Sequence, residues 1–328
     1  MARPSLDLPD MAWHLRELLR QVPRGRVTTY GALAAALGDA VAARWVGHFL
    51  LHHDHEDTCP CHRVVRSDGQ LGQYIASVAA KRQRLAMEGV EALGDAVDLA
   101  RFGFERFRGD RPLERLRQWQ EAVASAVSLR GPRRMPRLVA GLDVSYPSED
   151  RGVGAYALVE LSSRRLLWKI TVTEDIRFPY ISSYLGFREL PIHFRLIEAA
   201  RAAGQIADVL MVDGSGILHP RRAGIATQLG VTVEIPTIGV TKKLLCGEVN
   251  LEGLGPADSR PVVHDGQILG VALRPRLTSL RPIFVCPGHR IGVAAAKRMA
   301  RKLLCGHPLP EPIFWADRLS RAEGRRLR

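Results

Sequence analysis

One segment constrains the fold of this chain more than any other, residues 213–231, DGSGILHPRRAGIATQLGV. The apolar run directly before it, residues 209–212, predicts a buried strand. Gly214 and Gly216 then allow a tight turn, and the proline after His219 favours the start of a helix. A carboxylate at a strand end, with a histidine and two arginines beyond it, suits a divalent metal beside a phosphate. A solvated acid with a surface arginine pair fits the same pattern.

A second acid lies near the end of another predicted strand. The run LVAGLD ends at Asp143, and residues 154–161 and 166–173 predict two more strands. Three strands followed by alternating helices and strands predict an α/β fold, a mixed sheet flanked by helices. Asp143 and Asp213 would supply the hard oxygen ligands that Mg2+ requires.

Five sequence blocks, in the same order along the chain, resemble the endonuclease V family of DNA repair nucleases. They are LVAGLDVSY around Asp143, FPYISSYLGFREL ending near Glu189, the segment from Asp213, IPTIGVTKKLLCG around Lys242, and CPGHRIGVAAAKR around His289. The tail LPEPIFWADRLSR is also similar to the family's C-terminus, so the resemblance covers about residues 110–322. It implies a ribonuclease H-like fold, in which acids from neighbouring strands and a helix converge on a metal ion.

The resemblance also implies roles for individual residues. Asp143 and Asp213 would bind Mg2+, with Mn2+ as an alternative. Lys242, favoured over Lys243 by its spacing, would hold phosphate, and His219 would shape the site and contact phosphate. Glu189 would be a third acid, and His289 would orient water or support the metal ligands. The implied catalytic set is therefore Asp143, Asp213, Glu189, Lys242 and His289.

Recognition of a damaged base is implied by two further segments. In this family a wedge opens the duplex beside a deaminated base, and the matching residues here are Pro179, Tyr180 and Ile181. Tyr180 offers a stacking face, whereas Ser182 stands where the wedge usually ends in proline. Backbone groups at Gly214 and Gly216 would take the flipped hypoxanthine. The resemblance implies cleavage of DNA at the second phosphodiester 3′ of deoxyinosine, leaving a 5′-phosphate.

The first ninety or so residues have a different pattern. Apolar residues at helical spacing predict a helix over residues 9–22. Thr28 or Thr29 can cap a second helix over residues 30–37, and a third is predicted over residues 41–51. Two short helices joined by a glycine-containing turn indicate a helix-turn-helix, a DNA-binding unit.

Histidines and cysteines crowd the segment at residues 52–62, HHDHEDTCPCH. Both residue types bind zinc, but Cys59, Cys61 and His62 are almost adjacent on a backbone that a proline stiffens, which disfavours a zinc site. A nucleophilic cysteine is a second interpretation, because a base next to Cys61 lowers the pKa of its thiol. An inert, half-buried thiol is the third.

The motif PCHRVV, which contains Cys61, resembles the active-site signature of O6-alkylguanine-DNA alkyltransferases, over about residues 9–92. A relay of Glu88, His62 and a water would give a Cys61 thiolate, which takes the alkyl group from a flipped base. The resemblance also implies three binding roles. Tyr30 matches the residue that crowds the phosphate, Arg44 matches the residue that replaces the flipped base, and Tyr74 matches a residue that lines the alkyl pocket.

Two departures from the alkyltransferase pattern leave alternatives open. His53 stands where that family has a hinge asparagine, and Ile-Ala-Ser follows Tyr74 in place of a Ser-Gly-Gly-like loop. These changes also fit a non-enzymatic module that senses alkylated bases and recruits the nuclease, although Cys61 argues for transfer. An inosine-specific ribonuclease, the activity of eukaryotic-type endonuclease V proteins, is a further alternative that fusion to a DNA-lesion domain disfavours.

Composition agrees with a nucleic-acid partner. Lys and Arg number 47 against 34 acids, a net charge of +13, which favours a polyanion such as DNA. The expected partner is double-stranded DNA with deaminated or alkylated bases. Five unevenly placed cysteines indicate a reducing cytoplasm, and no apolar run approaches the roughly 18 residues of a membrane span. We expect a monomer with an alkyltransferase-like domain at residues 1–92, a linker at 93–108 and a nuclease domain at 109–328.

Overall fold

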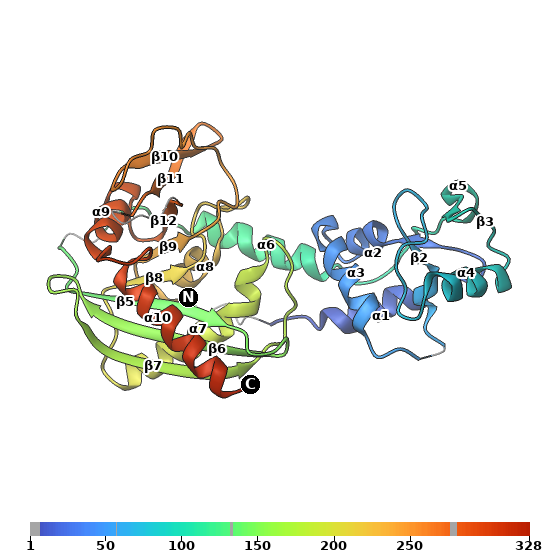
Figure 1. Cartoon of the computed structure of the whole chain (residues 1–328), viewed down its shortest axis with the longest axis horizontal. Helices are drawn as coiled ribbons and strands as arrows, with labels where there is room; N and C mark the ends of the chain where they lie inside the picture. The colour runs from blue at the N-terminus through green and yellow to red at the C-terminus, as the bar shows by residue number, and fades with distance from the viewer. Residues whose placement is uncertain (1–6, 57, 132–133, 276–280) are drawn as a thin grey trace. The chain divides into compact units, whose positions relative to one another are not determined.

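Figure 1 presents the computed structural model of the chain, which describes residues 7–56, 58–131, 134–275 and 281–328. The chain divides into two compact units. The N-terminal unit comprises Asp7–Gln118 together with Phe178–Ser182, and the C-terminal unit comprises Trp119–Arg177 and Ser183–Arg328.

The N-terminal unit is mainly helical. Its helices are α1 (Met11–Arg20), α2 (Tyr30–Ala36), α3 (Ala43–His52), α4 (Val78–Met87) and α5 (Leu99–Phe102), with the start of α6 (Pro112–Ser125). Two short strand pairs complete it, β1 (Thr28–Thr29) with β2 (Val64–Val65), and β3 (Ala92–Leu93) with β4 (Ala96–Val97).

The predicted helix-turn-helix is confirmed by α2 and α3, which pack against each other. Thr29 caps α2, because its hydroxyl accepts a hydrogen bond from the Ala32 backbone N–H at 3.0 Å. Residues 93–108, predicted to be a linker, contain β4 and α5 within this unit. Phe102 of α5 is buried in its core, so this segment adds to the packing of the unit.

An eight-stranded mixed sheet forms the C-terminal unit. Strands β5 and β9 run parallel to β8 between them, and every other neighbouring pair is antiparallel. In spatial order the strands are β10 (Ser259–His264), β11 (Gln267–Leu273), β12 (Ile283–His289), β9 (Thr237–Thr241), β8 (Val209–Asp213), β5 (Leu138–Ser145), β6 (Arg151–Glu160) and β7 (Leu166–Asp175).

Helices cover both faces of this sheet, which confirms the predicted fold class. Side chains alternate along a strand: Val139 and Met211 pack on one side with α9 (Val293–Leu303) and α10 (Glu311–Arg326). Ala140 and Leu210 pack on the opposite side with α7 (Leu185–Ala202) and α8 (Ile225–Val233). Strands β5 and β8 are therefore buried on both faces.

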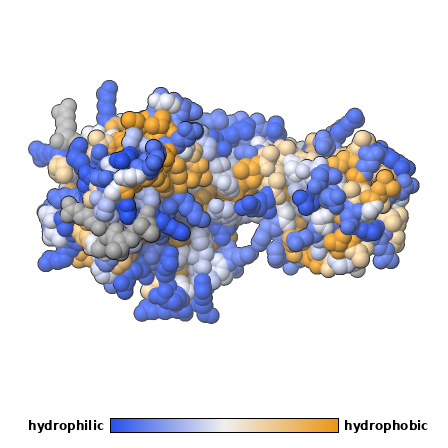
Figure 2. All heavy atoms as spheres, turned by 45° about the horizontal axis from the view of Figure 1, so that its top comes forward, coloured by the Kyte–Doolittle hydropathy of each residue, from blue (hydrophilic) through white to orange (hydrophobic). Residues whose placement is uncertain are grey.

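Hydrophilic residues cover much of the face of the molecule shown in Figure 2, and hydrophobic residues gather there in smaller patches. Within the described part of the chain, no helix combines the length and the apolar character that a membrane crossing requires.

Candidate functional site

The register of β5 and β8 brings the two predicted metal ligands together. Leu142 of β5 pairs with Val212 of β8 in parallel, so Asp143 and Asp213 follow at the same edge of the sheet. Along their strands, both acids lie on the same face of the sheet as Val139 and Met211, the face that α9 and α10 cover. Gly141 permits the close approach of α10, because a Cβ there would lie 2.0 Å from the carbonyl oxygen of Pro312.

The approach of α10 adds a third carboxylate that sequence reasoning missed. Asp317 lies on α10, and oxygens of Asp143, Asp213 and Asp317 all lie within 4.8 Å of one another. The Ser320 hydroxyl, one turn further along α10, donates a 2.6 Å hydrogen bond to Asp143 Oδ2. The tail around WADRLS pointed to the family but gave no reason to choose its acid over others.

Lys242, predicted to hold phosphate, extends beside these carboxylates. Its Nζ lies 3.9 Å from Asp213 Oδ2 and 3.6 Å from Asp317 Oδ1. Its side chain is half exposed, so the ammonium can meet a phosphate from solvent. The backbone N–H and carbonyl of Lys243 instead bond the hydroxyl of Thr241.

Glu189, the predicted third acid, comes from α7 and is buried. The Tyr146 hydroxyl donates to Glu189 Oε1 at 2.7 Å. Burial raises the pKa of Glu189 to about 8. Repulsion from Asp143 and Asp213 adds to this effect, and the hydrogen bond from Tyr146 opposes it. Burial and the charge of Asp143 likewise raise the pKa of Asp213 to about 7. The acidic cluster therefore holds more negative charge than this buried position favours, which suits a bound cation.

A cleft of about 470 Å3 opens over the carboxylates. Its lining carries the three acids Asp143, Asp213 and Asp317. It also carries arginines from the C-terminal half of α10 and from the chain end, Arg321, Arg325 and Arg328, and Arg321 pairs with Asp317 at 2.9 Å. Acidic and basic groups in one cleft suit a metal ion next to a phosphodiester.

The register does not bring His289 to the carboxylates. His289 pairs with Thr237 at the start of β9, whereas Asp213 pairs with Val240, three residues further along. At about 3.3 Å per residue this separates them by roughly 10 Å along the strands. His289 Nδ1 accepts a hydrogen bond from the Ser128 backbone N–H at 3.3 Å. The predicted water-orienting role has no support in this geometry.

His219 is a buried structural residue in this fold. Its Nδ1 accepts from the Arg221 backbone N–H at 3.1 Å, so Nε2–H donates to the Ser183 carbonyl at 3.0 Å. Burial lowers the pKa of His219 to about 4, and the ring stays neutral. Its predicted contact with phosphate is not supported, and the histidine instead fixes the backbone at Ser183.

The glycine loop is packed more tightly than a purely ligand-binding loop requires. A Cβ at Gly216 would lie 2.1 Å from the carbonyl oxygen of Pro287 on β12. Gly214 is in the positive-φ region at 155°, and a Cβ there would lie 2.4 Å from Ile225. Gly214 is partly exposed and Gly216 is buried, so only the first is accessible to a ligand.

In the predicted wedge, Tyr180 is 62% exposed and Ile181 is buried.

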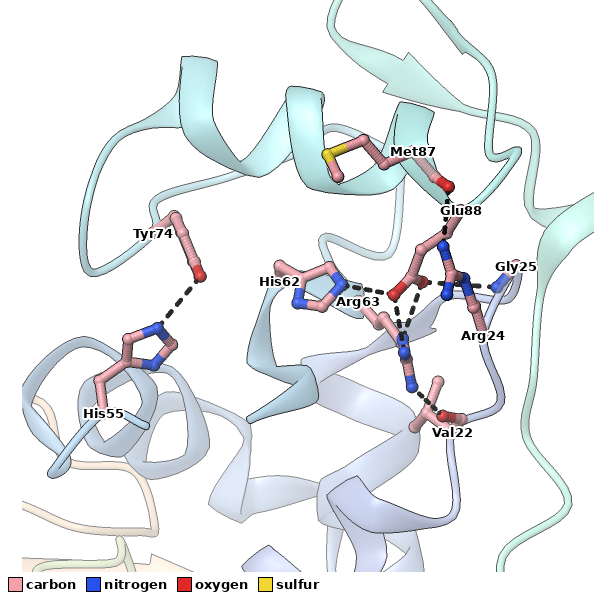
Figure 3. Close-up of polar contacts among 9 residues, drawn as sticks. All are labelled: Val22, Arg24, Gly25, His55, His62, Arg63, Tyr74, Met87 and Glu88. Carbon is pink, nitrogen blue, oxygen red and sulfur yellow. Dashed lines mark hydrogen bonds and ion pairs between the residues drawn. The ribbon is translucent and has the colours of Figure 1, made fainter. Parts of the chain in front are cut away.

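In the N-terminal unit, the predicted Glu88–His62 pair is present (Figure 3). His62 Nε2 lies 3.0 Å from Glu88 Oε1. Arg63 donates to both carboxylate oxygens, at 2.8 and 2.7 Å, and to the Val22 carbonyl. Burial opposes ionisation, but the hydrogen bonds from Arg63 and His62 hold the pKa of Glu88 at about 2. Burial lowers the pKa of His62, so the neutral ring donates from Nε2 and offers Nδ1 as an acceptor.

Cys61 is buried at a short 3-10 turn, Pro60–Arg63. Its Sγ lies 3.4 Å from His55 Nδ1, and Cys59 Sγ lies 3.4 Å from His53 Nε2. Hydrogen bonding between the two thiols lowers the pKa of Cys59 to about 5, and the same contact together with burial raises the pKa of Cys61.

Tyrosines flank this cysteine pair. The Tyr74 hydroxyl lies 3.4 Å from His55 Nε2, and the Tyr30 hydroxyl donates to the Gln73 carbonyl at 3.4 Å. Arg44 is the second residue of α3 and is exposed. The predicted pocket residues thus surround Cys61, while Arg44 is available to a partner.

The Glu88 network makes a stability prediction. Replacing Glu88 with alanine leaves the Arg63 guanidinium buried without its carboxylate, so the free energy of unfolding should fall by about 3 kcal/mol. Denaturant unfolding of the full chain measures this. Because the pKa of folded Glu88 lies below its ordinary 4.5, the contribution is complete above pH 4.5 and disappears as the pH falls towards about 2.

An exposed ion pair in the same unit provides the control. Glu91 and Arg101 are 2.8 Å apart with both side chains more than half exposed. Glu91→Ala should cost less than about 1 kcal/mol. Equal losses in the two variants would contradict a special role for Glu88.

Comparison with known proteins decides the family. The profile of endonuclease V matches residues 121–318, more than half of the chain. The chain belongs to the endonuclease V family. A second profile, the DNA-binding domain of 6-O-methylguanine DNA methyltransferase, matches residues 10–90. The C-terminal unit is therefore the endonuclease unit, and the N-terminal unit is the alkyltransferase unit.

One known relative is matched over both units, and two solved structures are matched over about two thirds of this chain. The bifunctional methyltransferase/endonuclease of Picrophilus torridus is 35% identical over 90% of this chain and 90% of its own length. Human endonuclease V, 30% identical, matches 65% of this chain and 98% of its own with a TM-score of 0.60. Ciona intestinalis endonuclease V, solved with inosine-containing DNA, is 25% identical over 67% of this chain and 100% of its own, with a TM-score of 0.59. The chain is a bifunctional DNA repair protein with endonuclease and methyltransferase activities.

Proposed function

We propose that the endonuclease unit nicks double-stranded DNA at the second phosphodiester 3′ of deoxyinosine. The observation that carries this proposal is the carboxylate cluster of Asp143, Asp213 and Asp317 in a cleft that arginines also line. The Ciona relative was solved with DNA containing inosine, which supports the same lesion here.

The donor set of this cluster fits Mg2+, or Mn2+ as an alternative. All three ligating groups are carboxylates, the hard oxygen donors that these cations prefer. Burial and mutual repulsion raise the pKa of Asp213, and a cation relieves both effects. When bound, such an ion would neutralise charge on the scissile phosphate and activate water.

The surrounding residues hold the phosphate and the carboxylates. The Lys242 ammonium would bind a phosphate oxygen as a point charge. Ser320 orients Asp143 through their 2.6 Å hydrogen bond. Glu189, held by a hydrogen bond from Tyr146, would serve as the further acid of the site.

We further propose that the alkyltransferase unit moves an alkyl group from O6-alkylguanine to Cys61. The Cys61 sulfur forms a bond to the alkyl carbon, the bond from that carbon to O6 breaks, and the released guanine takes up the thiol proton. Burial of Cys61 beside Tyr74 and His55 supports this role, because a flipped base needs an enclosed pocket. The five cysteines are all thiols, which fits the reducing cytoplasm that we propose as the location.

One experiment tests both activities. The protein is incubated with an inosine duplex, an O6-methylguanine duplex or an inosine-containing RNA, each with and without EDTA. We expect nicking of the inosine DNA that EDTA abolishes, and alkyl uptake that EDTA leaves unchanged. Preference for the RNA would instead support an inosine-specific ribonuclease, and binding of the alkylated duplex without uptake would support a lesion sensor.

Tyr180 supplies a separate prediction for specificity. Its ring is 62% exposed and would stack beside the opened base pair. Tyr180→Ala should lower the preference for inosine over undamaged DNA about tenfold, since stacking on one base is worth roughly 1–3 kcal/mol. Binding to undamaged duplex should change much less, because phosphate contacts set it. Competition binding with both duplexes measures the ratio, and an unchanged ratio would remove Tyr180 from the wedge.

A further inference from the structure

A second cluster of metal-ligating side chains lies in the alkyltransferase unit. It consists of His53, His55, Cys59 and Cys61, and one ligand atom from each lies within 4.8 Å of all the others. Two of the contacts, Cys59 with His53 and Cys61 with His55, are 3.4 Å long. This cluster has no carboxylates and shares no residue with the acidic site.

The geometry matches a tetrahedral zinc site. Zinc binds sulfur at about 2.3 Å and imidazole nitrogen at about 2.0–2.1 Å. Ligand atoms around one tetrahedral centre are then roughly 3.3–3.8 Å apart, which includes the two 3.4 Å contacts. We propose that His53, His55, Cys59 and Cys61 bind one zinc ion.

The short spacing that disfavoured zinc in the sequence does not apply to the folded chain. His62, the neighbour that would have been a third adjacent ligand, turns away and pairs with Glu88. The histidine ligands come instead from the C-terminal end of α3, where His53 is the first residue with extended backbone. The 3-10 turn after Cys59 then brings Cys61 to the same side. Two separate segments therefore supply two ligands each.

Chemistry and burial also fit zinc. Soft sulfur and imidazole donors select zinc over Mg2+, and two thiolates with two neutral imidazoles balance its double charge. His53 and Cys61 are 8% and 3% exposed, so such a neutral complex suits the site better than free thiolates. The Tyr74 hydroxyl lies 3.4 Å from the outer nitrogen of His55, the position where a partner commonly orients a zinc-binding histidine.

Zinc and the alkyl group would share Cys61. This consequence rests on the proposed alkyl transfer, because the same sulfur is its acceptor. When sulfur bonds to the alkyl carbon and the bond from carbon to O6 breaks, the departing guanine takes a proton from water, and a thiolate ligand becomes an uncharged thioether. The site then keeps three good ligands, so alkylation should weaken zinc binding and release the ion to a chelator.

Cobalt titration of the reduced full-length protein tests the site. Co2+ occupies zinc sites and gives a sulfur-to-cobalt charge-transfer absorption only when thiolates bind it. The carboxylate cluster cannot produce this band, so the two sites are distinguished. We expect the band to saturate at one Co2+ per chain and to disappear when one equivalent of Zn2+ is added. Absence of the band in the wild-type protein would overturn the proposal.

Variants locate the ion. His53→Ala and His55→Ala should each weaken Co2+ binding by at least about a hundredfold, because even residues that only orient a ligand cost about 10–100-fold. His52→Ala is the matched control, since His52 is an exposed neighbour whose Nδ1 bonds the His48 carbonyl. Cys246→Ser controls for a thiol outside the cluster. Circular dichroism checks folding, and equal loss in the His52 variant would contradict the assignment.

A final arm separates this proposal from the alkyl transfer. Zinc-loaded protein is mixed with O6-methylguanine duplex, and released Zn2+ is followed with a chromogenic chelator. We expect release in step with alkyl uptake. A cobalt band without alkyl uptake would support the zinc site and contradict the proposed alkyl transfer. Alkyl uptake by a protein that shows no cobalt band would support the transfer and contradict the zinc site.

Discussion

Replacing Asp213 with alanine should abolish nicking of an inosine-containing duplex in Mg2+, lowering the rate by at least about a thousandfold. Asp213 ends β8, Asp143 lies near the end of the adjacent parallel strand β5, and both converge with Asp317 on one point. The charge stabilisation that a bound metal supplies is worth several kcal/mol, and about 4 kcal/mol corresponds to a thousandfold in rate. Single-turnover nicking of the labelled duplex measures the loss, and Asp143→Ala should behave alike.

The loss should not come from unfolding. Burial and repulsion raise the pKa of Asp213 to about 7, so its charged form is unfavourable in the metal-free fold, and removing it should leave the unfolding temperature unchanged or higher. Alkyl uptake by the other unit is the internal control and should persist. A variant that nicks at the wild-type rate in Mg2+ would remove Asp213 from the site.

Replacing Cys61 with serine should eliminate alkyl uptake. The wild-type chain should take label from duplex carrying labelled O6-methylguanine once, saturating near one per chain, because a thioether has no nearby group to remove it. Serine keeps the size of the side chain but its hydroxyl ionises far less readily than a thiol. Gel separation of protein from DNA after the reaction measures the label, and binding to the alkylated duplex should persist.

The cysteine pair makes a second comparison informative. Cys59 has no matching position in the alkyltransferase pattern, although its thiol lies beside that of Cys61. The neighbouring Cys59 thiol and burial raise the pKa of Cys61, and Cys59→Ser removes that thiol. We therefore expect Cys59→Ser to retain uptake, with nicking intact in both cysteine variants. If alkyl uptake is lost in Cys59→Ser but retained in Cys61→Ser, then Cys59 is the alkyl acceptor instead of Cys61.

Local sequence patterns determined the elements and much of the chemistry. The apolar run before Asp213 predicted β8, and the spacing from Asp213 favoured Lys242, whose ammonium lies beside the carboxylates. Thr29 and the helical spacing after it predicted α2. The strand and the helix depend on residues close together in the chain, so the sequence encodes them without reference to distant parts, whereas the choice of Lys242 rested on the matching family motif.

Only the tertiary structure decided which distant residues meet. Asp317 lies over a hundred positions beyond Asp213, and it joins the cluster because Gly141 lets α10 pack closely on β5. His289 stands in a matching motif, but strand register places it at the other end of β9. Spacing along the chain fixes local geometry, whereas register and helix packing, set by burial of whole faces, fix which side chains converge.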